Sequence, residues 1–245
     1  PRAGLDGVKP DVAAPGVSVV AAQTGVIGAN SFAGGSNNLT LSGTSRAAPH
    51  VAGMMALLKE RFPASSVEEL KAVVMNTALR DVFRTTGLSV RAGVDLVGAG
   101  VIDPVRAVQS TVTAVNDDEP EAVSLGFFGE VLGSDTRTKR LRLTNHGTTA
   151  ETFTLDFDIA NDAPGMDFLL PGGNSVTVPA GSSVTVDVQV RSTAALMHHV
   201  RDATAAATQS IPSGVQAWLA GWGVLNRFYL TNKSRSNITE CFGSA

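Results

Sequence analysis

The segment 43–53 constrains the fold of this chain more than any other stretch. It reads Gly43-Thr44-Ser45-Arg46-Ala47-Ala48-Pro49-His50-Val51-Ala52-Gly53. Gly43 can adopt backbone angles that other residues avoid, so it allows a sharp turn directly before Ser45. Apolar residues then continue to about Arg61 and predict a long helix, in whose first turn Pro49 costs little. Because this helix is apolar nearly all round, we expect it to be buried.

Ser45 has the position in this segment that most favours chemistry. It lies at or near the N-terminus of the predicted helix, where backbone N–H groups have no helical acceptor. The positive end of the helix dipole favours negative charge at the same place. An oxyanion that develops beside Ser45 would therefore be stabilised during acyl transfer.

These residues resemble the nucleophile segment of the subtilisin-like serine peptidases, whose pattern is Gly-Thr-Ser-x-Ala-Ala-Pro-His-Val-Ala-Gly. All ten fixed positions match, which is far more specific than a lone serine flanked by glycine. The resemblance implies that Ser45 is the catalytic nucleophile, which forms an acyl-enzyme with the substrate. The family usually has Met where this chain has Arg46, so a long cation must be accommodated beside the nucleophile, towards solvent or against substrate.

A second motif lies about thirty residues upstream. Lys9-Pro10-Asp11-Val12-Ala13-Ala14-Pro15-Gly16 resembles the Lys-Pro-Asp-x-x-Ala-Pro-Gly stretch that precedes the nucleophile in the same family. Because both motifs occur in the order found in the family, a chance match is very improbable. For the Lys9 and Asp11 side chains we favour a local scaffold contact over proton transfer.

Two further helices are expected after the first. Ser65 or Ser66 can cap a helix that extends to about Ala78, with acidic residues in its first turn. A glycine-rich turn at 98–100 leads into a short final helix. Both segments again resemble the family, so the resemblance covers about residues 1–115. It implies the C-terminal part of an α/β peptidase domain, with a mostly parallel sheet between helices.

The pattern of the chain changes after an acidic linker at 116–121. From 122 to about 230, apolar and polar residues alternate with a period of two and are interrupted by glycine-containing turns. This pattern predicts an all-β antiparallel sandwich. By pattern and position it resembles the fibronectin-type-III-like domains that often follow subtilisin-like catalytic domains. We expect residues 231–245 to form an irregular tail.

The histidine and aspartate of a subtilisin-type triad should lie upstream of the serine, as should the side-chain amide of the oxyanion hole. No histidine precedes Ser45 in this sequence. His50 follows Ser45 by five residues, which is beyond one helical turn, and we expect it to be a buried, hydrogen-bonded residue. The chain is therefore expected to be a fragment that is inactive alone, from a parent serine endopeptidase. A pseudopeptidase with a broken triad, or a surface-binding module that uses the sandwich, remains an alternative.

Charge and composition exclude other classes of function. The net charge of −3 gives no electrostatic case for nucleic acid, and the longest apolar stretch is too short to span a bilayer. The adjacent His198 and His199 would face opposite sides of a strand, so we expect no metal site there. The single cysteine, Cys241, can form no internal disulfide.

The family resemblance carries several further expectations. It implies a polypeptide substrate, secretion, and chemistry that needs no cofactor. It allows structural calcium, for which no site can be recognised in the sequence. Contact of the sandwich with a cell surface or polymer is a further expected role.

Overall fold

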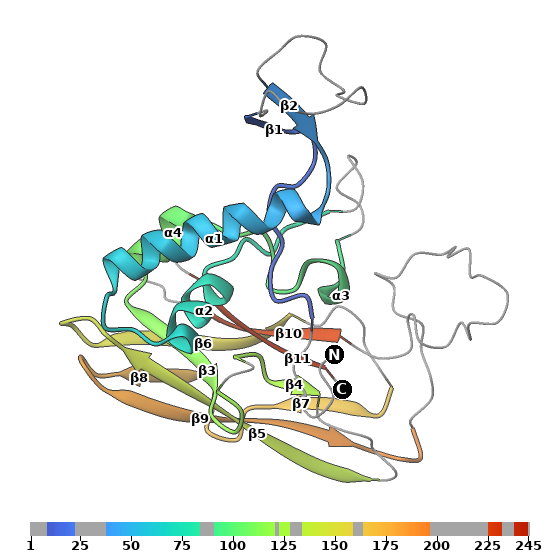
Figure 1. Ribbon diagram of the computed structural model, residues 1–245. Coiled ribbons are helices and arrows are strands. Elements are labelled where there is room, and N and C mark those ends of the chain that lie inside the picture. Colours follow the sequence, from blue (N-terminus) through green and yellow to red (C-terminus); the bar gives the residue numbers. More distant parts are fainter. Residues whose placement is uncertain are drawn as a thin grey trace, which may run out of the picture.

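Helices and two β-sheets form separate layers of the molecule in a computed structural model of residues 1–245 (Figure 1). The structure describes residues 9–22, 38–83, 91–120, 123–127, 134–158, 164–196, 225–231 and 238–244, the last two ranges by backbone alone. The expectations for His198 and His199 lie outside these residues. No helix in the described ranges is long and apolar enough to cross a membrane.

The described residues of the N-terminal part form a hairpin and four helices. The hairpin consists of β1 (Val19–Ala22) and β2 (Asn38–Leu41). The helices are α1 (Thr44–Arg61), α2 (Val67–Asn76), α3 (Val94–Val97) and α4 (Pro104–Gln109). The expected extent of α1 is confirmed. The N-cap of α2 is Ser66, whose side chain accepts from the Glu69 backbone N–H while the Glu69 carboxylate accepts from the Ser66 N–H.

The mostly parallel sheet expected for residues 1–115 is not found in the described part of that segment. The strands β1 and β2 pair with each other in antiparallel register, with Val19 opposite Leu41. Among the described residues of this N-terminal segment, a parallel contact occurs only as an isolated bridge between Ala13 and Val101. A parallel ladder needs several strands joined by crossovers, whereas the two strands described here meet as a hairpin.

The rest of the described chain forms two sheets. The five-stranded sheet has the order β4 (Gly126–Phe127), β11 (Ile238–Ser244), β10 (Leu225–Thr231), β6 (Glu151–Asp158) and β8 (Ser175–Val178). The four-stranded sheet has the order β3 (Val112–Asn116), β5 (Asp135–Asn145), β9 (Ser183–Ser192) and β7 (Met166–Leu169). Neighbouring strands are antiparallel except β11 and β4, which are parallel.

One hydrophobic cluster contains side chains from both sheets. Alternate residues of β5, β6 and β9 point into it, as the period of two predicts. Its fully or nearly fully buried members are Val112, Ala114, Leu125, Leu141, Leu143, Phe153, Leu155, Val178, Val186, Val188 and Val190. The more specific likeness to a fibronectin-type-III domain stays a prediction.

The C-terminal tail differs from the expectation of irregular structure. Residues 238–244 form β11, which pairs with β10 from Thr231↔Ile238 to Leu225↔Ser244. The local sequence has little β alternation, but the backbone of β10 offers it a continuous row of hydrogen-bonding groups.

The first strand of the sheet region, β3, starts at Val112 and pairs with β5. The predicted division of the chain at residue 115 therefore falls inside a strand, and the domain boundaries stay a prediction.

The helix α1 is less buried than its sequence indicates. Met54 and Leu58 are buried, but Leu57 is 51% exposed. One face of α1 packs on α2 and α4 through a cluster that includes Leu70 and Ala107. Among the described residues nothing covers the opposite face, which is why the helix is not buried all round (Figure 1).

Candidate active site

A glycine turn joins β2 to α1 and places Ser45 in the first turn of the helix. Gly43 is the residue before the helix and has φ 155°, a value that favours glycine. Its N–H donates to the Gly16 carbonyl over 2.7 Å. A Cβ on Gly16 would lie only 2.9 Å from the Gly43 carbonyl oxygen. The end of the upstream motif thus packs directly against the turn before Ser45, and only glycine allows this approach.

The side chain of Ser45 is accessible. Ser45 is exposed, and its hydroxyl makes no hydrogen bond with any described residue. A Cβ on Gly43 would lie 3.3 Å from the Ser45 Oγ, closer than most such contacts. The absence of a side chain at Gly43 therefore leaves the Ser45 hydroxyl unobstructed from that direction.

The start of α1 offers positive potential without a competing anion. No acidic residue lies in its first turn, and no side chain caps it. The Arg46 N–H donates to the Gly43 carbonyl over 2.9 Å, whereas the Ser45 N–H has no acceptor among the described groups. The Ser45 N–H can therefore donate to an oxyanion that forms beside its own hydroxyl.

The imidazole of His50 is attached to the backbone of its own helix. Its Nδ1–H donates to the Arg46 carbonyl oxygen, with 2.9 Å between the two atoms. The residue is exposed, so the expectation of a buried histidine was wrong, because the described chain does not cover this face of α1. His50 has no contact with the Ser45 hydroxyl among the interactions of the described residues.

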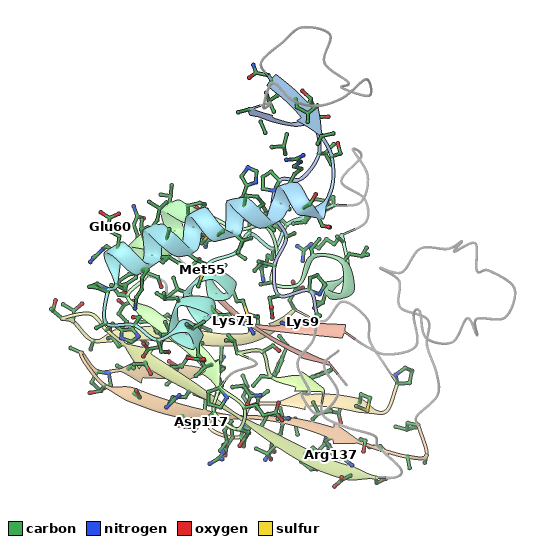
Figure 2. All side chains as sticks on the ribbon, viewed as in Figure 1. Lys9, Met55, Glu60, Lys71, Asp117 and Arg137 are labelled. Carbon is green, nitrogen blue, oxygen red and sulfur yellow. The ribbon has the colours of Figure 1, made fainter. Side chains whose placement is uncertain are left out.

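The upstream motif contains a small charge cluster away from the serine. The Asp11 carboxylate pairs with Lys9 through one oxygen and lies 3.3 Å from the Lys71 Nζ through the other. Figure 2 shows Lys9 and Lys71 below α1, towards the sheets. These contacts join the motif to α2, as a scaffold role requires.

The structure adds contacts that residue spacing does not reveal. The pairing of Gly16 with Gly43 and the hydrogen bond from the Ser18 N–H to the Ser42 Oγ, 2.8 Å, hold the two motifs together. The sequence feature that could have indicated this contact is Gly16, the last residue of the upstream motif. Across the described ranges, no three His, Cys, Asp or Glu side chains are grouped so as to hold a metal ion.

Comparison with known proteins shows that the N-terminal part is similar to a peptidase family. Residues 5–100 match the model of the subtilase family, Peptidase_S8, and this range contains both motifs. The chain is 27% identical over 184 residues to the minor extracellular protease Vpr of Bacillus subtilis (strain 168), covering 75% of this chain and 21% of that protein. It is 38% identical over 112 residues to the subtilisin-like protease SBT1.3 of Arabidopsis thaliana, covering 42% of this chain and 14% of that protein. The matches thus span about a fifth or less of these relatives.

The structural comparison is less informative. A FixG-related protein from Vibrio parahaemolyticus matches 54% of this chain and 91% of its own at 14% identity, with a TM-score of 0.31. This TM-score is too low to support a shared fold.

Proposed function

We propose, from the subtilase match over residues 5–100, that the protein carrying this chain is a serine endopeptidase with Ser45 as its nucleophile. The observation that carries the proposal is the position of Ser45. An exposed serine stands in the first turn of an 18-residue helix, inside the matched range and without a hydrogen-bond partner in the described chain. The similarity to proteases that are named subtilisin-like supports it.

The proposed reaction proceeds through an acyl-enzyme. The Ser45 Oγ attacks the carbonyl carbon of a peptide bond and gives its proton to a histidine base, which passes it to the leaving amine. Water then attacks the acyl carbon and gives a proton to the same base. The base passes this proton to the Ser45 Oγ as the carboxylic acid is released. The Ser45 N–H donates to the oxyanion in both steps. We assign the histidine, its orienting aspartate and a second oxyanion donor to parts of the whole protein outside this chain, which alone would be inactive.

The proposed chemistry needs side chains and water but no cofactor. The family resemblance allows structural calcium, yet no described residue is assigned here as its ligand. A polypeptide is the proposed substrate. Secretion is proposed from relatives such as the protein named a minor extracellular protease. We also propose that the two sheets form a fibronectin-type-III-like domain that contacts a cell surface or polymer.

A fluorophosphonate probe tests the proposal, because it reacts only with an activated serine. The full-length protein is labelled beside a Ser45→Ala variant and a Ser175→Ala control, which removes an exposed serine at the start of β8. We expect labelling of the wild type and of Ser175→Ala, and none of Ser45→Ala. A folded, mature protein that takes no label would contradict the proposal and favour the pseudopeptidase or the surface-binding module.

A further inference from the structure

The residue that follows the nucleophile is a cation with a fixed backbone. The Arg46 N–H donates to the Gly43 carbonyl over 2.9 Å, and the Arg46 carbonyl accepts from the His50 imidazole over 2.9 Å. Arg46 is half-buried, between the exposed Ser45 and the half-buried Ala47. The starting point of its side chain relative to the Ser45 hydroxyl is therefore held by the helix.

The position of this cation is unfavourable unless an anion is present. The first turn of a helix stabilises negative charge, and a guanidinium there opposes the helix dipole. No acidic residue lies in the first turn of α1 to compensate. Local conflicts of this kind are expected at functional sites, where another requirement outweighs stability.

Several other arginines of the described chain pair with aspartates. Arg91 contacts Asp158 over 2.9 Å, and Arg140 contacts Asp118 over 2.7 Å. Arg46 has no carboxylate partner among the described residues. Its guanidinium is thus available to a carboxylate from another molecule, which it can bind through two parallel hydrogen bonds.

We infer that Arg46 is a specificity-determining residue that binds an acidic side chain of the polypeptide substrate beside the bond that is cleaved. This inference rests on the proposed function, because it needs the substrate to approach Ser45. Arg46 follows Ser45 directly at the helix start, and the arginine side chain is long. Its charge can therefore reach substrate residues that flank the scissile bond. The charge of a substrate carboxylate is present before the reaction, so the preference should appear in KM as well as in kcat/KM.

Matched peptides test the inference on the full-length protein. A cleaved, internally quenched peptide is prepared with Glu or Gln at each position that flanks the scissile bond, and kcat/KM is measured for each pair. The variants are Arg46→Met, which removes the charge at similar length, and Arg46→Lys, which keeps it. Arg61→Met is the matched control, because it removes the same charge at the other end of α1.

We expect one flanking position at which the wild type prefers Glu over Gln by about two- to five-fold at low salt, an effect that salt reduces. Arg46→Met should abolish this preference, Arg46→Lys should keep part of it, and Arg61→Met should keep all of it. If Ser45 takes the fluorophosphonate label but the Glu-to-Gln ratios of the wild type and of Arg46→Met are equal, the inference is wrong and the proposed function stands. If Ser45 takes no label, the proposed function and this inference fall together.

Discussion

The helix α1 and the two sheets contain similar apolar residues but bury them to different degrees. In β5, Leu141 and Leu143 are 0% exposed, because side chains of the opposite sheet cover them. In α1, Leu57 remains 51% exposed although its neighbour Leu58 is 0% exposed. The difference shows that apolar composition alone does not determine burial. A surface on another segment has to cover the residue, and the sheets provide one within the described chain.

The two regions also differ in what their exposed residues can do. The sheets hold a continuous core and expose mostly polar and charged side chains in pairs, such as Arg140 with Asp118. At the start of α1, Ser45 is exposed at a helix terminus that no side chain caps, and the half-buried Arg46 has no carboxylate partner among the described residues. We therefore expect substitutions at the start of α1 to change activity, and substitutions between the sheets to change stability.

The largest expected effect is on activity and comes from Ser45→Ala in the full-length protein. The change removes the nucleophile, so kcat should fall by about 10⁴-fold or more. Because the hydroxyl is exposed and unbonded in the described chain, the free energy of unfolding should change by less than about 0.5 kcal/mol. Peptide hydrolysis and urea denaturation measure the two quantities. A large loss of stability would mean that Ser45 supports the fold.

The next largest effect is a loss of stability, which we compare for substitutions of two leucines. Leu143→Ala opens a cavity in the core between the sheets and should lower the free energy of unfolding by about 2–5 kcal/mol. Leu57→Ala is the matched substitution on the exposed face of α1 and should cost less than about 0.5 kcal/mol. Urea denaturation followed by circular dichroism compares them in one protein. Equal losses would show that α1 is covered by parts of the protein outside this chain.

A smaller loss of stability is expected from a substitution at the contact between α2 and β3. The side-chain oxygen of Asn76, at the end of α2, accepts from the Ala114 N–H of β3 over 2.8 Å, and both residues are 0% exposed. Asn76→Ala leaves that buried N–H without its acceptor and should cost about 1–3 kcal/mol. Asn116→Ala serves as a comparison, because Asn116 bonds within the sheet region instead. Hydrogen exchange at Ala114 should accelerate in Asn76→Ala and not in the comparison variant.

The capping box of α2 should contribute less. Ser66→Ala removes the acceptor of the Glu69 N–H, which costs about 1 kcal/mol at a typical N-cap. Ser66→Asp keeps an acceptor and should retain most of the stability. The thermal midpoints of the two variants measure the difference. Equal midpoints would mean that the start of α2 is held by packing and not by its cap.

The smallest effect is a dependence of stability on pH in the sheet region. Burial raises the pKa of Asp118, but hydrogen bonds from the Arg140 backbone and guanidinium outweigh it and hold the pKa below its ordinary 3.8. A lowered folded pKa stabilises the protein above pH 3.8, and this contribution is lost as pH falls through the folded value.

Asp118→Asn should therefore destabilise the protein slightly at neutral pH. The difference from the wild type should shrink as the pH falls below 3.8. Thermal denaturation across this range measures it, and Asp167→Asn, which alters an exposed pair with Arg191, is the control. A difference that does not change with pH would contradict the assignment.

Several elements were predictable because their signals are local. The extent of α1, a cap of α2 at Ser65 or Ser66 and the alternating residues of β9 depend on neighbours a few positions away, and the structure selects Ser66 as the cap. The motif around Ser45 was equally readable, since a turn and a helix start depend on adjacent residues. The strand β11 was missed, because its formation depends on pairing with β10.

The sequence by itself determined the turn at Gly43, the helices α1, α2 and α4, and the period-two pattern of the later strands, whereas the short α3 was not predicted. The tertiary structure alone decided that Gly16 supports Gly43, that Asn76 holds β3 and that one face of α1 stays exposed. The physical reason is one of range. Backbone angles and caps depend on residues close in the chain, whereas burial and pairing depend on surfaces that distant segments bring together.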